Sequence, residues 1–259
     1  MEYAQKGSLR QNLNNNFNEL TWDNKLYSLY LIALGLADIH DKKLIHRDFH
    51  CGNILSATTE YTCITDLGLC KPANEKSEKS EKRIYGVLPY VAPEVLRGKE
   101  YTQASDIYGF GIIAYEVCTG YPPYHDMAHE ENLATRICKG LRPNSNYKIP
   151  QVILDIIKQC WDADPLKRPK AEELRKLFWD LYMDLHNNRN PTLSEQVKEA
   201  NEINKNLPSS SSLTGTLSYT THPQAIYTSR LLNFKDLPEP KNDDEPKNDD
   251  NDDLKYSGN

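Results

Sequence analysis

The side chains best suited to chemistry lie in two short segments. The first reads His46-Arg47-Asp48-Phe49-His50-Cys51-Gly52-Asn53, and the second reads Asp66-Leu67-Gly68. Asp48, Asn53 and Asp66 offer carboxylate and amide oxygens, the hard ligands that Mg²⁺ prefers in proteins. Acidic residues in loops can also do no more than cap backbone N–H groups. The residue types alone therefore leave a catalytic and a structural interpretation open.

Further motifs follow these segments along the chain. They are Ala92-Pro93-Glu94, then Asp106 with Gly111, then Cys160-Trp161-Asp162-Ala163-Asp164-Pro165 with Arg168-Pro169. Together the motifs resemble the catalytic loop, the D-F-G and A-P-E elements and the later signatures of protein kinases. The last one is typical of tyrosine kinases and tyrosine-kinase-like serine/threonine kinases. Each short motif alone is weak, but their common order resembles the protein kinase superfamily throughout residues 1–185.

The resemblance implies phosphoryl transfer from ATP to a protein hydroxyl. Asp48 would accept or orient the proton of that hydroxyl, while Asn53 and Asp66 would hold Mg²⁺ ions that bridge the nucleotide phosphates. Such transfer depends on positioning and charge neutralisation more than on covalent catalysis. Serine/threonine transfer is the expectation. The run Gly120–Tyr124 resembles tyrosine kinases, so tyrosine transfer stays open.

Other matched residues would have structural roles by the same resemblance. Glu94 and Arg168 would form a buried ion pair that fixes the activation segment. Asp106 would bond to the backbone near His46 and Arg47.

The resemblance also implies packing around the nucleotide. His46 and Leu67 would belong to the hydrophobic spine, with Gly68 completing the D-F-G-like element. Leu55 would lie beneath the adenine ring.

The match to the family begins abruptly. Residues 1–9 resemble the kinase hinge, in which backbone groups of Glu2 and Ala4 would meet adenine. The glycine-rich loop, the strand lysine and the helix glutamate that precede the hinge in the family have no counterpart here. Half of the nucleotide site would face water, where charge stabilisation is weak. We therefore expect this chain alone to transfer phosphate very slowly or not at all.

Two positions depart from the serine/threonine pattern. His50 stands where such kinases have a lysine two residues after the catalytic aspartate. Gly86 is followed by Val87, where the family has threonine. His50 still supplies a hydrogen-bond donor near the reacting groups. The paired change fits either a modified catalytic loop or a degenerate site.

The segment that follows Asp66-Leu67-Gly68 and ends before Ala92 is charged and carries hydroxyl groups. Ser77, Ser80 and Tyr85 are candidate phosphorylation sites, and a phosphate there could pair with Arg47 through charge-assisted hydrogen bonds. A plain solvated loop explains the composition equally well.

Apolar patterns predict a mainly helical scaffold for these residues. Ile54-Leu55 and Cys63-Ile64 flank a polar turn and predict a hairpin that delivers Asp66 to the catalytic edge. Helices are predicted over 26–37, from a cap at Ser105 to Thr119, over 152–160, and from Pro169 to 181. The helix after Ser105 is apolar nearly all round and should be buried centrally. The expected fold is a protein-kinase-like C-lobe, mainly α, with a small β-hairpin at the catalytic edge.

Composition excludes several classes of function. The net charge of −6 argues against the broad basic surface of a nucleic-acid binder. No apolar run reaches the length of a membrane span, and the N-terminus lacks the pattern of a signal peptide. The six cysteines include no C-x-x-C pair, which favours reduced thiols in the cytoplasm or nucleus.

The composition changes after about Leu185. The later residues are rich in Asn, Ser, Pro and Asp, and Glu239–Asp244 is repeated as Glu245–Asp250. Such a segment has little to bury, so we expect a kinase domain over 1–186 and a disordered polar and acidic tail over 187–259, with a partial helix near 194–203.

Three hypotheses follow. The first is an ATP- and Mg²⁺-dependent protein kinase that acts on protein substrates. The second is a pseudokinase-like binding or scaffold module that recruits proteins or partner kinases through the groove around Tyr121–His129. The third is a decayed fragment without a stable fold. The sequence does not define the oligomeric state.

Overall fold

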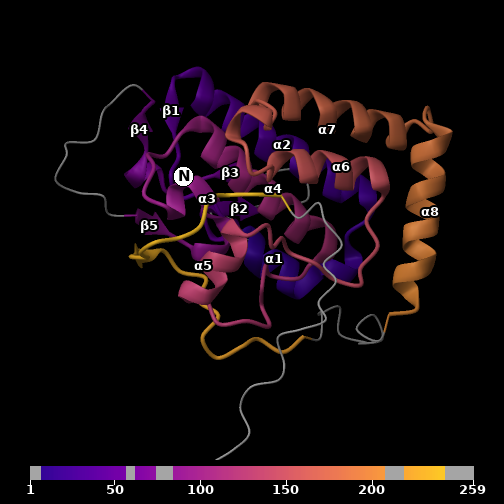
Figure 1. Cartoon of the computed structure of the whole chain (residues 1–259). Helices are drawn as coiled ribbons and strands as arrows, with labels where there is room; N and C mark the ends of the chain where they lie inside the picture. Colours follow the sequence, from indigo (N-terminus) through magenta and orange to yellow (C-terminus); the bar gives the residue numbers. More distant parts are fainter. Residues whose placement is uncertain (1–6, 57–61, 74–83, 208–218, 243–259) are drawn as a thin grey trace, which may run out of the picture.

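The computed structural model describes residues 7–56, 62–73, 84–207 and 219–242 (Figure 1). Its α-helices in these ranges are α1 (Leu9–Asn16), α2 (Trp22–Asp41), α3 (Pro93–Leu96), α4 (Gln103–Thr119), α5 (Glu131–Cys138), α6 (Gln151–Cys160), α7 (Ala171–His186) and α8 (Pro191–Lys205). Its strands are β1 (Leu44–Ile45), β2 (Ile54–Ser56), β3 (Thr62–Ile64), β4 (Lys71–Pro72), β5 (Ile84–Gly86) and β6 (Arg230–Leu232). The strands pair antiparallel as β1 with β4, β2 with β3 and β5 with β6. The described chain is thus mainly helical with small sheets, as expected.

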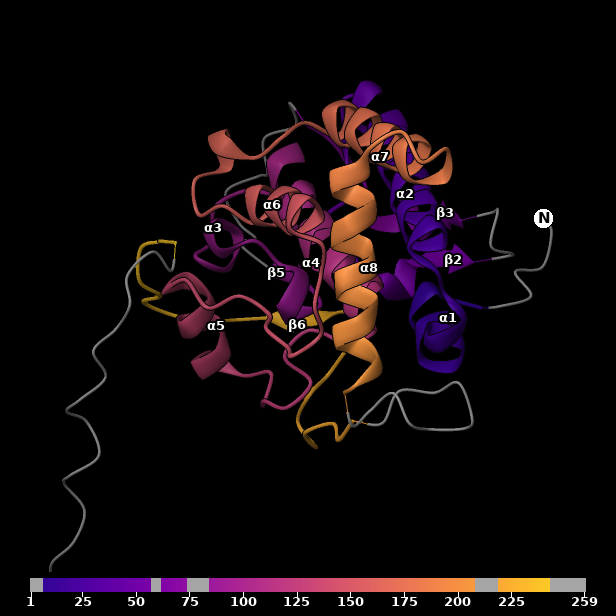
Figure 2. The same ribbon diagram turned by 90° about the vertical axis from the view of Figure 1, so that its right-hand side faces the viewer.

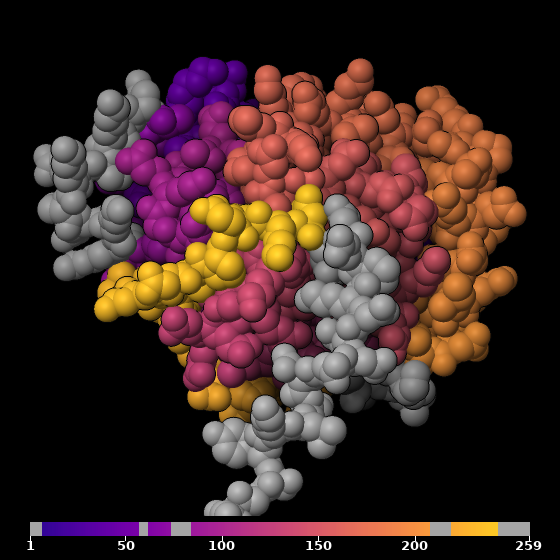
Figure 3. All heavy atoms as spheres, in the orientation of Figure 1, coloured from indigo at the N-terminus to yellow at the C-terminus, as the bar shows by residue number. Residues whose placement is uncertain are grey.

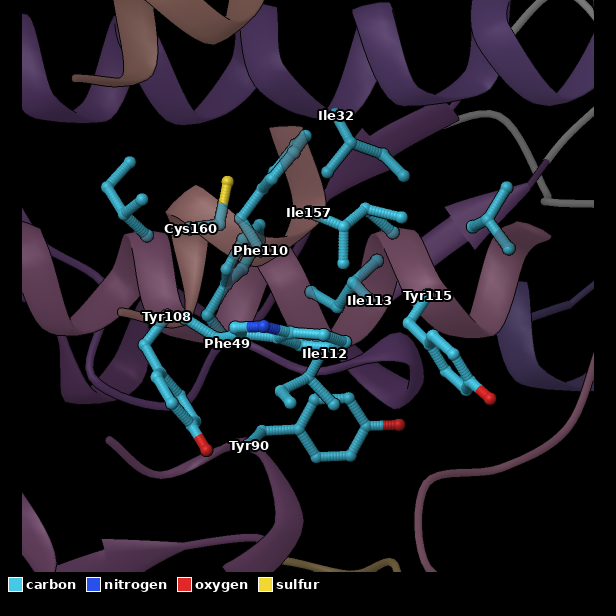
Figure 4. Packing of buried hydrophobic residues seen from close by; sticks show 14 of the residues in the cluster. Ile32, Phe49, Tyr90, Tyr108, Phe110, Ile112, Ile113, Tyr115, Ile157 and Cys160 are labelled. Carbon is cyan, nitrogen blue, oxygen red and sulfur yellow. The ribbon is translucent and has the colours of Figure 1, made fainter. Parts of the chain in front are cut away.

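Helix α4 lies at the centre of the core. Ile112, Ile113 and Phe110 are fully buried, and Figure 4 shows them packed among side chains of several elements. The predicted cap at Ser105 is wrong by one turn. Thr102 caps the helix instead, because its hydroxyl accepts the Ser105 N–H while the Ser105 hydroxyl accepts the Thr102 N–H, a capping box.

Close contact between α4 and α6 depends on Gly111. A Cβ at this position would lie only 2.7 Å from the Cβ of Cys160, closer than carbon atoms pack. Gly111, which is grouped with Asp106 among the sequence motifs, therefore lets the two helices approach.

Helices α2 and α7 run side by side along one face of the molecule (Figures 1 and 2). Aromatic pairs join them: the rings of Tyr27 and Tyr182 are 5.0 Å apart, and those of Tyr30 and Trp179 are 4.8 Å apart. The predicted start of α7 at Pro169 is early, because the helix begins at Ala171 and Lys170 occupies the cap.

The predicted hairpin is confirmed as β2 and β3, with Ile54 opposite Ile64 and Leu55 opposite Cys63. The N-terminal segment is attached to the same hairpin, since Ser8 bridges Leu55. The polar turn between the strands lies outside the described residues.

The expectation of disorder beyond residue 186 is wrong for 219–242. Within 187–207 the partial helix expected near 194–203 is present as α8, which is longer than expected. Helix α8 buries Leu193, Val197 and Ala200 on one face. The Asn204 side chain bonds both the N–H and the carbonyl of Lys148, at 2.7 and 2.9 Å. Three buried apolar residues at helical spacing dock a helix whose other residues are mostly polar. The second acidic repeat, 245–250, lies outside the described residues.

Residues 219–242, called the tail segment below, cross the surface of the body (yellow in Figure 3). Strand β6 within it pairs with β5, and Leu232 and Leu237 are buried. The sequence interpretation missed this segment because its apolar residues are scattered among polar ones and pack on a surface that other elements build. In the described part of the chain, no helix combines the length and apolarity that a bilayer span requires.

Candidate active site

Asp48 and Asn53 lie together in the loop between β1 and β2. The Asp48 side chain is almost fully buried. The amide nitrogen of Asn53 donates to the Asp48 carbonyl at 2.9 Å and to Asp48 Oδ2 at 3.2 Å. Because the nitrogen is committed to Asp48, the amide oxygen of Asn53 is the end left for a cation.

Asp66 is brought to the same edge by the hairpin. The N–H of Thr65 donates to the Asn53 carbonyl at 2.8 Å, so Asp66 follows directly on the residue that contacts Asn53. Asp66 has a left-handed backbone with φ 57°, its Oδ1 accepts the Gly68 N–H at 3.4 Å, and the residue is exposed. This backbone contact places the loop that carries Asp66 beside the loop that carries Asn53.

The donor set suits Mg²⁺. Asp66 offers an exposed carboxylate and Asn53 an amide oxygen, both hard ligands, and Mg²⁺ keeps several waters or phosphate oxygens as further ligands. Within the ranges described, His, Cys, Asp and Glu form no group of three that could hold a metal alone. A cation here would thus be shared with another molecule.

The backbone of the loop is fixed by Asp106 at the start of α4. Its carboxylate accepts the N–H groups of His46 and Arg47 at 2.8 and 3.1 Å and also contacts His40 Nε2 at 3.0 Å. Arg47 has φ 71°, a conformation costly for a non-glycine residue. The predicted bonds from Asp106 are confirmed, and they hold this strained turn in place.

His50 faces Asp48. Its Nδ1 accepts the Gly52 N–H at 3.0 Å, so in the neutral ring the proton lies on Nε2, 3.6 Å from Asp48 Oδ1. Burial alone would raise the pKa of Asp48, but the adjacent His50 ring and the hydrogen bonds from Ser229 and Asn53 outweigh burial and hold that pKa below its usual value. Asp48 is therefore a carboxylate at neutral pH, the form that can accept a proton.

Ser229 of the tail segment reaches this site, and the sequence interpretation missed it. Its hydroxyl donates to Asp48 Oδ2 at 2.5 Å and lies 3.3 Å from His50 Nε2. No motif surrounds Ser229. The sequence signals on either side of it were two short apolar runs, Ala225-Ile226-Tyr227 and Leu231-Leu232, inside a polar tail.

The predicted ion pair between Glu94 and Arg168 is confirmed. The guanidinium contacts both carboxylate oxygens, at 2.7 and 2.9 Å, and both side chains are buried. The pair joins α3 to the segment before α7.

The spine packing expected for Leu67 is wrong. His46 is fully buried and its Nε2 lies 3.1 Å from the Thr65 carbonyl, but Leu67 is 53% exposed. Leu67 lies in a short 3₁₀ turn at the surface, and no described element covers it.

The remaining predicted positions divide into two groups. Glu2, Ala4, Ser77 and Ser80 lie outside the described residues. Leu55 is half-buried in β2, and Tyr85 is 46% exposed in β5. Arg47 was the predicted partner of a phosphate on these hydroxyl groups. Its guanidinium lies over the ring of Tyr101, 5.1 Å from the ring centre.

The arrangement suits one kind of chemistry. An ionised, buried carboxylate touches a serine hydroxyl and the Asn53 amide, and the loop that carries Asp66 contacts Asn53. It could take a proton from a hydroxyl while a cation nearby neutralises a phosphate.

Comparison with known proteins gives an independent result. The family described as "Protein tyrosine and serine/threonine kinase" matches residues 1–178. Three similar proteins illustrate the relatives. The "Probable serine/threonine-protein kinase roco5" of Dictyostelium discoideum is 34% identical over 65% of this chain and 6% of its own length. A second probable serine/threonine-protein kinase of that organism is 33% identical over 68% and 19%. The "Protein kinase and PP2C-like domain-containing protein" of Arabidopsis thaliana is 31% identical over 59% and 29%.

The chain therefore spans only a small part of these relatives. The chain covers 10% of the length of each of the first three curated relatives that it matches.

Proposed function

The chain belongs to the protein tyrosine and serine/threonine kinase family, and from that premise we propose that it transfers the γ-phosphoryl group of ATP to serine or threonine hydroxyls of proteins. One observation carries the proposal. The ionised Asp48 accepts a hydrogen bond from a serine hydroxyl, with Asn53 bonded to the same carboxylate and Asp66 one residue from the Asn53 contact.

In this reaction Asp48 orients the acceptor hydroxyl and takes its proton at Oδ2. Its lowered pKa keeps it ionised before transfer. The amide nitrogen of Asn53 fixes the carboxylate in that position. Mg²⁺, held by Asn53 and Asp66, would neutralise charge on the nucleotide phosphates.

The kinase-like unit that we propose extends to about residue 186 and corresponds to the hinge and C-lobe of the family, with ATP and Mg²⁺ as cofactors and other proteins as substrates. Residues 1–259 by themselves would transfer phosphate slowly. Asp66 and Leu67 are exposed at one side of the site, and exposed charges stabilise a transition state weakly. We place the protein in the cytoplasm or nucleus, a proposal supported by six unpaired cysteine thiols.

The first test uses purified chain, radioactive ATP, Mg²⁺ and a generic protein substrate. We expect slow labelling that Asp48→Asn abolishes, because the amide cannot take the proton. Labelling that persists at the same rate in Asp48→Asn would disprove the assigned role.

A second test separates binding from transfer. MgATP should raise the melting temperature of the chain, and Asp66→Ala should remove that rise by deleting a cation ligand. Asp126→Ala, which changes an exposed acid outside the site, serves as the control and should keep the rise.

A pseudokinase-like binding module is the second candidate. The exposed Leu67 favours it, because an apolar side chain at the edge of the site offers a surface to another protein. A cooperative melt without labelling or MgATP stabilisation would support this alternative.

A further inference from the structure

The tail segment enters the site as a β-strand. Strand β6 pairs with β5 so that Gly86 lies opposite Arg230 and Ile84 opposite Leu232. A Cβ at Gly86 would lie 3.8 Å from Asp48 Oδ1 and 3.0 Å from Val91. The bare backbone of Gly86 therefore allows the strand pair to run close to the catalytic carboxylate. Ser229, the residue immediately before β6, contacts Asp48 for this reason.

Side chains on both sides of Ser229 fit the surface beneath them. The Tyr227 hydroxyl donates to the Pro123 carbonyl at 3.0 Å, and its ring lies 4.3 Å from the Arg10 guanidinium. The Arg230 guanidinium donates to the carbonyl of His129. This is the contact pattern of an extended peptide added to a strand edge, in which backbone pairing gives affinity and side-chain pockets give specificity.

The two leucines of β6 face opposite ways. Leu232 is 4% exposed and belongs to the core cluster, whereas Leu231 is 49% exposed. Alternation of this kind is normal in a strand with one buried face. It also provides a matched pair of positions for a test.

Both flanks of the strand are tied to the body. Before it, the N–H of His222 donates to the His125 carbonyl at 2.7 Å. After it, Arg97 Nη1 contacts a Glu239 carboxylate oxygen at 2.6 Å, and Arg97 Nε donates to the Leu237 carbonyl at 3.1 Å. Ser229 is thus presented to Asp48 at a high effective concentration.

We propose that Ser229 is a phosphoacceptor of this chain, and that the tail segment is its intramolecular substrate strand; the inference rests on the proposed function. Ser229 Oγ attacks the γ-phosphorus of ATP and forms the new O–P bond. The bond from that phosphorus to the β,γ-bridging oxygen breaks, and ADP leaves with the bonding electrons. The hydroxyl proton passes to Asp48 Oδ2, which already accepts it in a hydrogen bond.

The product would bind less well than the substrate. A phosphate on Ser229 places nearly two negative charges against the Asp48 carboxylate, and like charges at this distance repel. Transfer therefore releases the strand from β5 and frees the edge of β5 and the Asp48 carboxylate for other protein substrates.

The decisive experiment incubates the whole chain with Mg²⁺, radioactive ATP and a generic serine-containing protein, and maps phosphate by mass spectrometry. One turnover per chain is enough for detection, even at a slow rate. Phosphate on Ser229 should form at a first-order rate that is independent of chain concentration. Asp48→Asn should abolish it.

A matched pair of variants tests the docking. Leu232→Asp puts a charge into the core contact and should slow Ser229 labelling at least tenfold, while Leu231→Asp, on the exposed side, should change it less than twofold. Labelling of the generic protein and a cooperative melt report whether Leu232→Asp is still folded.

Hydrogen exchange supplies a readout that needs no catalysis. Backbone amides of Ile84–Gly86 should exchange faster in Leu232→Asp and in Ser229→Glu than in Thr228→Glu, whose side chain is exposed. Equal exchange in all three would overturn docking of the strand.

The outcomes separate the two proposals. If the generic protein is labelled and Ser229 is not, the inference is overturned and the proposed function stands. If Ser229 labelling rises in proportion to chain concentration, transfer occurs between molecules and the intramolecular inference is overturned. If neither protein is labelled, both proposals fall together.

Discussion

Arg168 and Glu94 form a bidentate ion pair in the core, although they are 74 positions apart in the chain. Nη1 lies 2.7 Å from Oε1 and Nη2 lies 2.9 Å from Oε2. Two further donors of Arg168 are used: Nη1 reaches the Ala104 carbonyl and Nε the Asp162 carbonyl, both at 2.9 Å. One side chain thus joins α3, the first turn of α4 and the loop before α7.

Removal of one partner should therefore be costly. Arg168→Ala leaves the buried Glu94 carboxylate without its counter-charge, and we expect the free energy of unfolding to fall by about 3–5 kcal/mol. Urea denaturation measures the change. Arg175→Ala is the control, because its pair with Glu172 is on the surface and should contribute nothing measurable. A loss as small as that of the control would show that Glu94 reaches solvent.

A second prediction concerns the strained turn of the catalytic loop. Asp106→Asn leaves one acceptor oxygen where the carboxylate used two, so one of the N–H groups of His46 and Arg47 loses its partner. We expect a loss of about 1–3 kcal/mol in stability and faster hydrogen exchange at those two amides. Asp126→Asn, an exposed position, is the control. Unchanged exchange would show that the turn is held without Asp106.

Most of the loop geometry could be predicted from sequence because each motif encodes its own partners. Asp106 bonds the turn, Arg168 pairs with Glu94, and the hairpin brings Asp66 to Asn53, all as the resemblance implied. These contacts depend on residue type at fixed spacing, and the resemblance supplied the partner in each case.

The tail segment could not be predicted in this way. Ser229 and Asp48 are 181 positions apart, and strand β6 directly after Ser229 forms by pairing with β5, far from it in the sequence. Composition reports how much apolar surface a segment carries and not whether a complementary surface exists elsewhere. Leu67 was misassigned for the opposite reason: the motif implied a packing partner that no described element supplies.

The third prediction concerns Lys25, which is buried in α2. Its Nζ donates to the Cys118 carbonyl at 2.9 Å and lies 4.0 Å from the centre of the Phe17 ring. Burial lowers its pKa from 10.5 to about 7. Between these values the unfolded chain binds a proton that the folded chain does not, so stability should rise with pH, by up to about 1.4 kcal/mol per unit.

Lys25→Met should remove this rise between pH 7 and pH 10, since methionine does not titrate. Urea midpoints at several pH values measure the slope for the wild type and the variant. Lys158→Met changes an exposed lysine on α6 and should keep the wild-type slope. A Lys25→Met slope equal to that of the wild type would mean that Lys25 stays charged in the folded chain.

The last prediction returns to Asp48. Burial favours its neutral form, and the adjacent His50 ring and the hydrogen bond from Ser229 oppose that effect strongly enough to lower the pKa. Ser229→Ala removes the 2.5 Å bond to Oδ2 and leaves burial in place, so the pKa of Asp48 should rise. Carboxyl NMR of labelled aspartate across acidic pH measures it directly. Thr228→Ala changes the neighbouring, exposed residue and should leave the titration unchanged. A pKa that stays the same in Ser229→Ala would mean that in solution the tail does not reach the carboxylate, and that His50 and Asn53 alone keep Asp48 ionised.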